Sequence, residues 1–123
     1  MVISQNVYSQ TDSLVPIQTT YLRLISSPKE YNGKRIIVDG FLHVKPEDYS
    51  LYFSKDNANL LIPECIMIDF DSSFIKKNNI LSYDGKFVSI QGVFLYNDKL
   101  GVLYRERIIN TSVLKVLKKV YKN

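Results

Sequence analysis

A phrase of twelve residues occurs twice in this chain, as "YNGKRIIVDGFL" at 31–42 and as "YDGKFVSIQGVF" at 83–94. An Asn-Gly or Asp-Gly pair is a typical turn, and the β-branched and aromatic residues that follow it are typical of a strand. A glycine inside a strand marks a bulge or a sharp bend. We therefore expect two strands with matching turn and bend glycines, Gly33 and Gly40 in the first copy and Gly85 and Gly92 in the second.

Three further strands and two short helices are expected around this pair. Alternating apolar residues predict strands in "YSLYFSK" and "LIPECIMIDF", and "VLYRERII" predicts the last strand after a hairpin turn. Thr19 or Thr20 could cap a short helix over 19–27, Asp71 or Ser72 another over 71–79, and "DNAN" predicts a turn. This order is that of an all-β, five-stranded Greek-key barrel, the OB-fold, whose first and fourth strands must bend to close the barrel.

The C-terminal residues allow two interpretations. "TSVLKVLKKVYK" places Val113, Val116 and Val120 on one helical stripe, whereas its β-branched content favours extended chain. A C-terminal helix and a continued strand are both left open. With 123 residues the chain is expected to form one domain over 15–123, preceded by a flexible segment, 1–14, and ending in a basic tail, 115–123.

The net charge of +4 is unevenly distributed. Residues 1–114 hold as many acids as bases, so the excess comes from four lysines of the tail. Residues 36–75 carry seven acids against two lysines. Nucleic-acid affinity depends heavily on neutralising phosphates, so this acidic centre argues against it and suits a basic protein partner.

The sequence predicts no enzyme, cofactor or metal site. One cysteine, Cys65, and one histidine, His43, give no disulfide and no zinc-ligand spacing. His43 is expected at a barrel rim without a catalytic partner, and Cys65 alternates away from the core face as an exposed, inert thiol. The first residues lack a signal-peptide pattern and no apolar run could span a bilayer, so a cytoplasmic protein is expected.

Four stretches carry a family resemblance: "LISSPKEYNGKRIIVDGFLHV", "LYFSKDNA", "IMIDF" and "YDGKFVSIQGVF". Together they cover most of 15–109 and resemble a group of small bacterial OB-fold proteins with a Tyr-x-Gly-Lys turn before each bent strand. Some of these look like immunity proteins encoded beside toxins. The resemblance implies a non-enzymatic inhibitor of a bacterial toxin, although "NDKLGVLYRERI" and the lysine tail depart from the family pattern.

Two functions follow from these observations. The first is an immunity protein that covers the active site or an exosite of a basic toxin with an acidic face, whose expected contacts are Glu47, Asp48, Tyr52, Asp56, Glu64 and Asp69. The alternative is a single-stranded nucleic-acid module that uses Tyr52, Lys55, Arg105, Arg107 and the lysine tail. Both need Tyr52 to face outward, while Tyr49 and Phe53 are expected in the core.

Overall fold

The computed structural model describes residues 15–46, 48–60, 64–101 and 104–117. Five strands close into a barrel in the order β2-β3-β4-β6-β5, with β5 pairing back onto β2. The pair β4–β6 is parallel and the other barrel pairs are antiparallel. The predicted all-β, OB-like barrel is confirmed. Its strands are β2 (Arg35–Lys45), β3 (Asp48–Tyr52), β4 (Ile66–Ile68), β5 (Lys86–Tyr96) and β6 (Glu106–Val116), with a short extra strand, β1 (Ile17–Gln18), parallel to β2.

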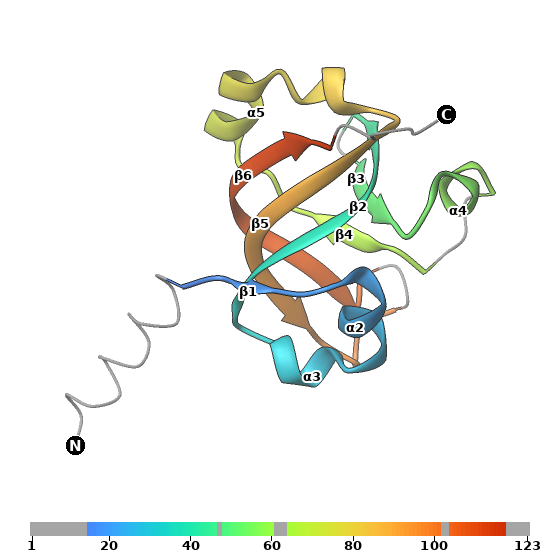
Figure 1. Cartoon of the computed structure of the whole chain (residues 1–123), viewed down its shortest axis with the longest axis vertical. Coiled ribbons are helices and arrows are strands. Elements are labelled where there is room, and N and C mark those ends of the chain that lie inside the picture. The colour runs from blue at the N-terminus through green and yellow to red at the C-terminus, as the bar shows by residue number, and fades with distance from the viewer. Residues whose placement is uncertain (1–14, 47, 61–63, 102–103, 118–123) are drawn as a thin grey trace, which may run out of the picture.

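Short helices lie at both ends of the barrel and on one side (Figure 1). Helices α2 (Tyr21–Ser26) and α3 (Pro28–Tyr31) lie at one end, and α5 (Ser72–Asn78) at the other, followed by a 3-10 turn, η1 (Ile80–Tyr83). The predicted caps are present, because the backbone N–H of Arg23 donates to Thr20 and that of Phe74 donates to Asp71. The fourth helix, α4 (Lys55–Asn59), replaces the turn predicted at "DNAN".

The core is formed by alternate residues of the long strands. Inward positions of β2 and β5 are fully buried while their neighbours are partly exposed, as expected for a sheet with one face in the interior. Burying each such side chain contributes about 1.5–3 kcal/mol. The largest fully buried side chains are Phe94, Leu24, Ile36, Leu42, Leu51, Ile66, Ile90 and Ile108.

The two copies of the repeated phrase lie side by side and are related by an approximate two-fold axis. Val38 of β2 lies opposite Ile90 of β5, and these residues occupy the same place in their copies. Gly40 lies opposite Val88, and the equivalent pair, Gly92 opposite Ile36, is also formed. The repeat therefore produces a symmetric antiparallel ribbon, β2 and β5, in the barrel wall (Figure 1).

Each turn of the repeat also holds the far end of the other strand. The N–H of Gly33 donates to the carbonyl of Phe94 at 2.7 Å, and Asn32 Oδ1 accepts from the N–H of Tyr96 at 2.9 Å. In the second copy, the N–H of Gly85 donates to the carbonyl of Leu42 at 2.8 Å. The carboxylate of Asp84 accepts from the N–H of Val44 at 2.7 Å. Gly33 and Gly85 have φ of 82° and 75°, a conformation that favours glycine.

The two strand glycines are needed because neighbouring residues approach them closely. A Cβ on Gly40 would lie 2.6 Å from Leu51 Cγ, and one on Gly92 would lie 2.6 Å from Ile108 Cγ2 and 2.8 Å from the Ile109 carbonyl. The predicted irregularity is present beside Gly92, where the register with β6 shifts between Gln91 and Val93. At Gly40 the pairing with β5 continues in register, so the approach of Leu51, rather than a bulge, requires the glycine.

The C-terminal ambiguity is resolved in favour of extended chain for the described residues. Strand β6 continues to Val116 and pairs with β5 through Val88↔Val116, so a helix beginning near Val113 is wrong. The antiparallel ladder with β5 pairs residues 113 to 116 of β6, and this pairing outweighs the helical spacing. Residues 118–123, which hold most of the basic tail, and the segment 1–14 lie outside the described residues.

We expect Gly40→Val and Gly92→Val each to lower the free energy of unfolding by about 1–3 kcal/mol, the usual cost of overpacking. The larger loss should be at Gly92, where the added atom meets backbone. Gly101→Val is the matched control, because nothing lies within 4 Å of a Cβ there. Chemical denaturation measures all three, and equal midpoints for the three variants would contradict the close-approach account.

We also expect Asp84→Ala to cost about 1–2 kcal/mol, because it leaves the N–H of Val44 without its acceptor. Asp84→Asn should retain most of the stability, since Asn32 holds the equivalent N–H of Tyr96 with an amide oxygen. Thermal melts compare the two variants. If Asp84→Asn is as unstable as Asp84→Ala, the carboxylate charge rather than the turn bond is what matters.

Candidate protein-binding surface

Helix α4 covers the outer face of the strands to which OB-folds commonly bind ligands. Ala58 of α4 packs with Tyr52 of β3 and with Cys65, which precedes β4, and these three residues are 3%, 6% and 2% exposed. Phe41 and Met67 pack against this small cluster. A second apolar layer therefore lies outside the barrel wall, beneath α4, which lies on one side of the barrel near β3 (Figure 1).

This layer overturns three predicted side-chain positions. Tyr52 was expected to face a partner and Cys65 to be exposed, and both are buried. Phe53 was expected in the core and is 46% exposed. The physical reason is that β3 ends at Tyr52, so the strand alternation stops there, while α4 covers the polar face of the strand. Tyr49 packs against the main core as predicted.

The predicted acidic contacts gather at two ends of the covered face. Ser50 pairs with Met67, so the antiparallel register brings Asp48 and Asp69 to one end of β3 and β4. Asp56 on α4 and Glu64 before β4 lie toward the other end. All four are exposed, and Glu47 lies outside the described residues. We call Asp48, Asp56, Glu64 and Asp69 the acidic rim.

The four acids differ in the ion pairs and hydrogen bonds that they already form within the protein. Asp69 forms an ion pair with Arg107 of β6, and Asp48 Oδ1 accepts from Ser50 Oγ at 3.2 Å. Within the described chain, Asp56 and Glu64 form no ion pair. These two carboxylates are therefore the most available to a cationic partner.

The hydroxyl and thiol groups beneath α4 stay protonated. Burial raises the pKa of Tyr52 to about 12, with the nearby Cys65 adding to the shift. Burial also raises the pKa of the Cys65 thiol, and that of Tyr21, whose hydroxyl donates to the Glu64 carbonyl at 3.2 Å. A protonated, enclosed thiol is a poor nucleophile, so this cluster is a packing layer.

His43 lies close to an aspartate and a serine, but the three residues do not make the contacts of a catalytic triad. Its Nδ1 is 3.9 Å from Asp84 Oδ1, and Ser50 is its cross-strand neighbour. Ser50 is 3% exposed and its hydroxyl donates to Asp48, while the Asp84 oxygen holds the N–H of Val44. The serine is enclosed and each carboxylate is used structurally, so these residues do not form a nucleophile–base pair.

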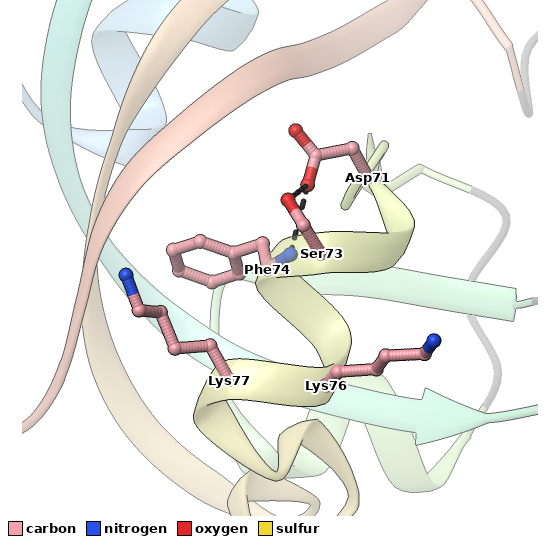
Figure 2. A pocket seen from close by; sticks show the side chains of 5 residues that line it. All are labelled: Asp71, Ser73, Phe74, Lys76 and Lys77. Carbon is pink, nitrogen blue, oxygen red and sulfur yellow. Dashed lines mark hydrogen bonds between the residues drawn. The ribbon is translucent and has the colours of Figure 1, made fainter.

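A hollow of about 470 Å³ lies along α5 and is explained by the helix itself (Figure 2). Asp71 accepts from the N–H of Phe74 at 2.9 Å and from Ser73 Oγ at 3.0 Å, and these bonds lower the pKa of its carboxyl. Phe74 stacks on Phe70 with ring centroids 5.5 Å apart. Figure 2 shows Lys77 on the same side as the Phe74 ring and Lys76 pointing away. The acid serves as a cap, and the ring serves as packing.

The residues predicted for nucleic acid do not form one site. Tyr52 is buried, and Lys55 lies at the start of α4 in a groove that includes Val116. Arg105 and Arg107 lie at the opposite end of β6, where they contact Glu106 and Asp69. The eleven residues of β6 place its two ends about 30 Å apart, which keeps these arginines away from Lys55.

Comparison with models of known protein families and with curated proteins gives no match to this chain. The described residues contain no group of three or more His, Cys, Asp or Glu side chains placed to hold a metal ion. None of the helices within those same ranges is long and apolar enough to cross a membrane.

One buried acid, Glu106, was not predicted from the sequence. It is 3% exposed, and its Oε1 has no hydrogen-bond partner in the described chain. Burial raises the pKa of its carboxyl, and nearby Glu64 adds to this, while Arg105, whose Nε is 3.6 Å from Oε2, offsets part of it. The sequence could have indicated this burial, because Glu106 lies two residues before Ile108 and therefore on the same inward face of β6.

We expect Glu106→Gln to raise the unfolding midpoint at about pH 7, because the raised pKa means that ionisation destabilises the folded state. Below about pH 4.3, the ordinary pKa of a glutamate, the Glu106 carboxyl is mostly protonated in both states and costs no stability. The free energy of unfolding then falls as pH rises through the raised pKa of the folded state. The advantage of the variant should therefore vanish at about pH 4. Melts at both pH values, with exposed Asp98→Asn as the control, measure this. A wild-type advantage at neutral pH would contradict it.

Proposed function

We propose that this protein is a non-enzymatic binding module whose acidic rim binds a basic protein partner. The observation that supports this most is the α4-covered face, where Tyr52 is buried and four exposed carboxylates border the covered surface. Asp56 and Glu64 carry no ion pair within the described chain, so a cationic partner would meet unneutralised charge. Complementary charge of this kind accelerates encounter and selects the partner.

Nucleic acid is a poor candidate for this same surface. Base stacking needs exposed rings, and Tyr52, the ring predicted for that role, is 6% exposed beneath α4. The exposed carboxylates of the acidic rim would also repel phosphates. The covered face suits a protein surface rather than a nucleic-acid strand.

The finer proposal is an immunity protein that neutralises a toxin in the cytoplasm. It is supported by the sequence resemblance, by the acidic rim and by the structural use of Ser50 and Asp84, the polar neighbours of His43. Toxins that attack nucleic acid are commonly basic because they bind phosphates. Inhibition would require only that the rim covers the toxin's active site or an exosite.

The test begins with capture from a lysate of the source cell, using wild-type protein and an Asp56→Lys/Glu64→Lys variant, with Asp98→Lys as the charge-reversal control. We expect a basic protein retained by the wild type and the control and lost by the double variant. Association with that purified protein at low salt should slow by about tenfold or more in the double variant, since steering charges act on the association rate.

The neutralising role is then tested by expressing the captured protein in a host cell, with and without this chain. Growth arrest that wild type relieves and the double variant does not is the expected result. A captured protein that is harmless to the host would overturn the immunity role, and retention that is insensitive to both mutation and salt would overturn the acidic interface.

A further inference from the structure

Strand β6 is much longer than β4, the strand that pairs with its outer edge. The eleven residues of β6 meet the three residues of β4 only at Arg107 and Ile108. After β4 the N–H of Asp69 donates to the Ile108 carbonyl at 2.8 Å, and the chain then turns into α5. Among the described residues no strand pairs with the rest of this edge, so β6 is an open edge strand from Ser112 to Val116.

The pairing with β5 shows which backbone groups of β6 face the open side. In an antiparallel pair, a residue that bonds to its partner alternates with one whose N–H and C=O point the other way. The N–H of Leu117 donates to the Phe87 carbonyl at 2.9 Å, so this pair is a bonded one. Counting back along the ladder, Ser112, Leu114 and Val116 direct their N–H and C=O groups away from β5.

The irregular stretch of β6 does not change this outward side. Between the pairs at Gln91 and Val93, β5 advances by two residues while β6 runs through four. Because both steps are even, Leu114 and Val116 face the same side as Ile108, whose carbonyl bonds to the residue after β4. In the part of the chain that the structure describes, neither Leu114 nor Val116 has a backbone hydrogen bond on that side.

The side chains along the open edge leave it accessible. Ser112 and Lys115 are exposed, Val116 is 42% exposed, and Val113 is partly exposed. Leu114 is 8% exposed and belongs to the core, so it holds the strand in place. An accessible edge with free N–H and C=O groups is a template for a further strand.

We propose that two copies of this chain pair through this edge, with β6 antiparallel to its counterpart about a two-fold axis beside Leu114. Leu114 then lies opposite Leu114 of the second copy, and Ser112 lies opposite Val116. The outward groups repeat at equal steps on both sides of Leu114, which makes the edge complementary to itself. The two sheets become continuous across the axis, and each copy satisfies the open edge of the other.

The one charge on this edge selects the register. Lys115 is the only charged residue among 112–116, and in the proposed register it lies opposite Val113 of the second copy. Moving the axis to Lys115 would place the two lysines directly opposite, which is destabilising. Moving it to Val113 would extend the ladder to Asn110, whose φ of 52° interrupts regular pairing.

The contact is small, because only the short open edge of each copy forms it. We therefore expect a dimer that dissociates on dilution, in contrast with the large interfaces of obligate dimers. Its formation does not rest on the protein-binding proposal, because the open edge and the acidic rim have no residue in common. Each proposal can therefore fail while the other holds.

Sedimentation velocity of the full chain, from micromolar to near-millimolar concentration, measures the dimer directly. Wild type should shift from monomer to dimer as the concentration rises. At low salt, Val113→Glu should tighten the dimer by about two- to thirtyfold, because each copy gains one cross-strand pair of opposite charge with Lys115. Val113→Lys should weaken the dimer by a similar factor, and high salt should reduce both effects.

The role of the backbone is tested at Val116. Val116→Pro removes one outward N–H from each copy and should weaken the dimer, whereas Val116→Ala keeps that N–H and should dimerise as wild type does. Leu81→Glu and Leu81→Lys, at an exposed position outside the edge, are the charge controls and should leave the dimer unchanged. Circular dichroism checks that every variant is folded.

Three outcomes would overturn the proposal. A wild type that stays monomeric at every concentration would do so and would leave the edge to a strand of another protein. Equal dimerisation of Val113→Glu and Val113→Lys at low salt would exclude the register. A dimer that folded Val116→Pro leaves intact would place the contact elsewhere on the molecule.

Discussion

The antiparallel pairing of β2 with β5 is the interaction on which the rest of the barrel depends. It joins β2, the first strand of the barrel, to β5, the fourth, and thereby closes the sheet. The turn before each strand holds the far end of the other through a glycine N–H and an Asn or Asp side chain. Because the two clamps are reciprocal, losing either one loosens both strands. Symmetry of this kind explains why the same phrase appears twice.

The outer surface of the barrel is divided by α4. On one side, Ala58 closes over Tyr52 and Cys65 and turns the outer face of β3 and β4 into a second packing layer. On the other side, the end of β3 leaves Phe53 exposed beside Phe41 and Phe87. Both surfaces therefore adjoin the same short helix. The proposed acidic interface follows from the exposed acids of the rim rather than from the net charge of +4, which sums over the whole chain.

The parts of this structure that depend on local chemistry could be predicted from the sequence. Thr20 and Asp71 cap helices because their side chains accept backbone N–H bonds, and Gly33 and Gly85 occupy turns with positive φ. Tyr52 and Phe53 were exchanged in the prediction because strand alternation says nothing about where a strand ends or what packs outside it. The acidic rim could be named by residue, but only the antiparallel register shows that Asp48 and Asp69 share one end of the covered face, while Asp56 and Glu64 lie toward the other.

The most direct test of the acidic interface is a carboxylate footprint of the complex with the captured basic protein. Carbodiimide labelling followed by mass spectrometry reports the accessibility of each exposed acid in the free and bound states. The account predicts that Asp56 and Glu64 become protected while Asp98, on the β5–β6 turn, is labelled equally in both states. Protection at Asp98 with unchanged labelling of Asp56 and Glu64 would contradict it.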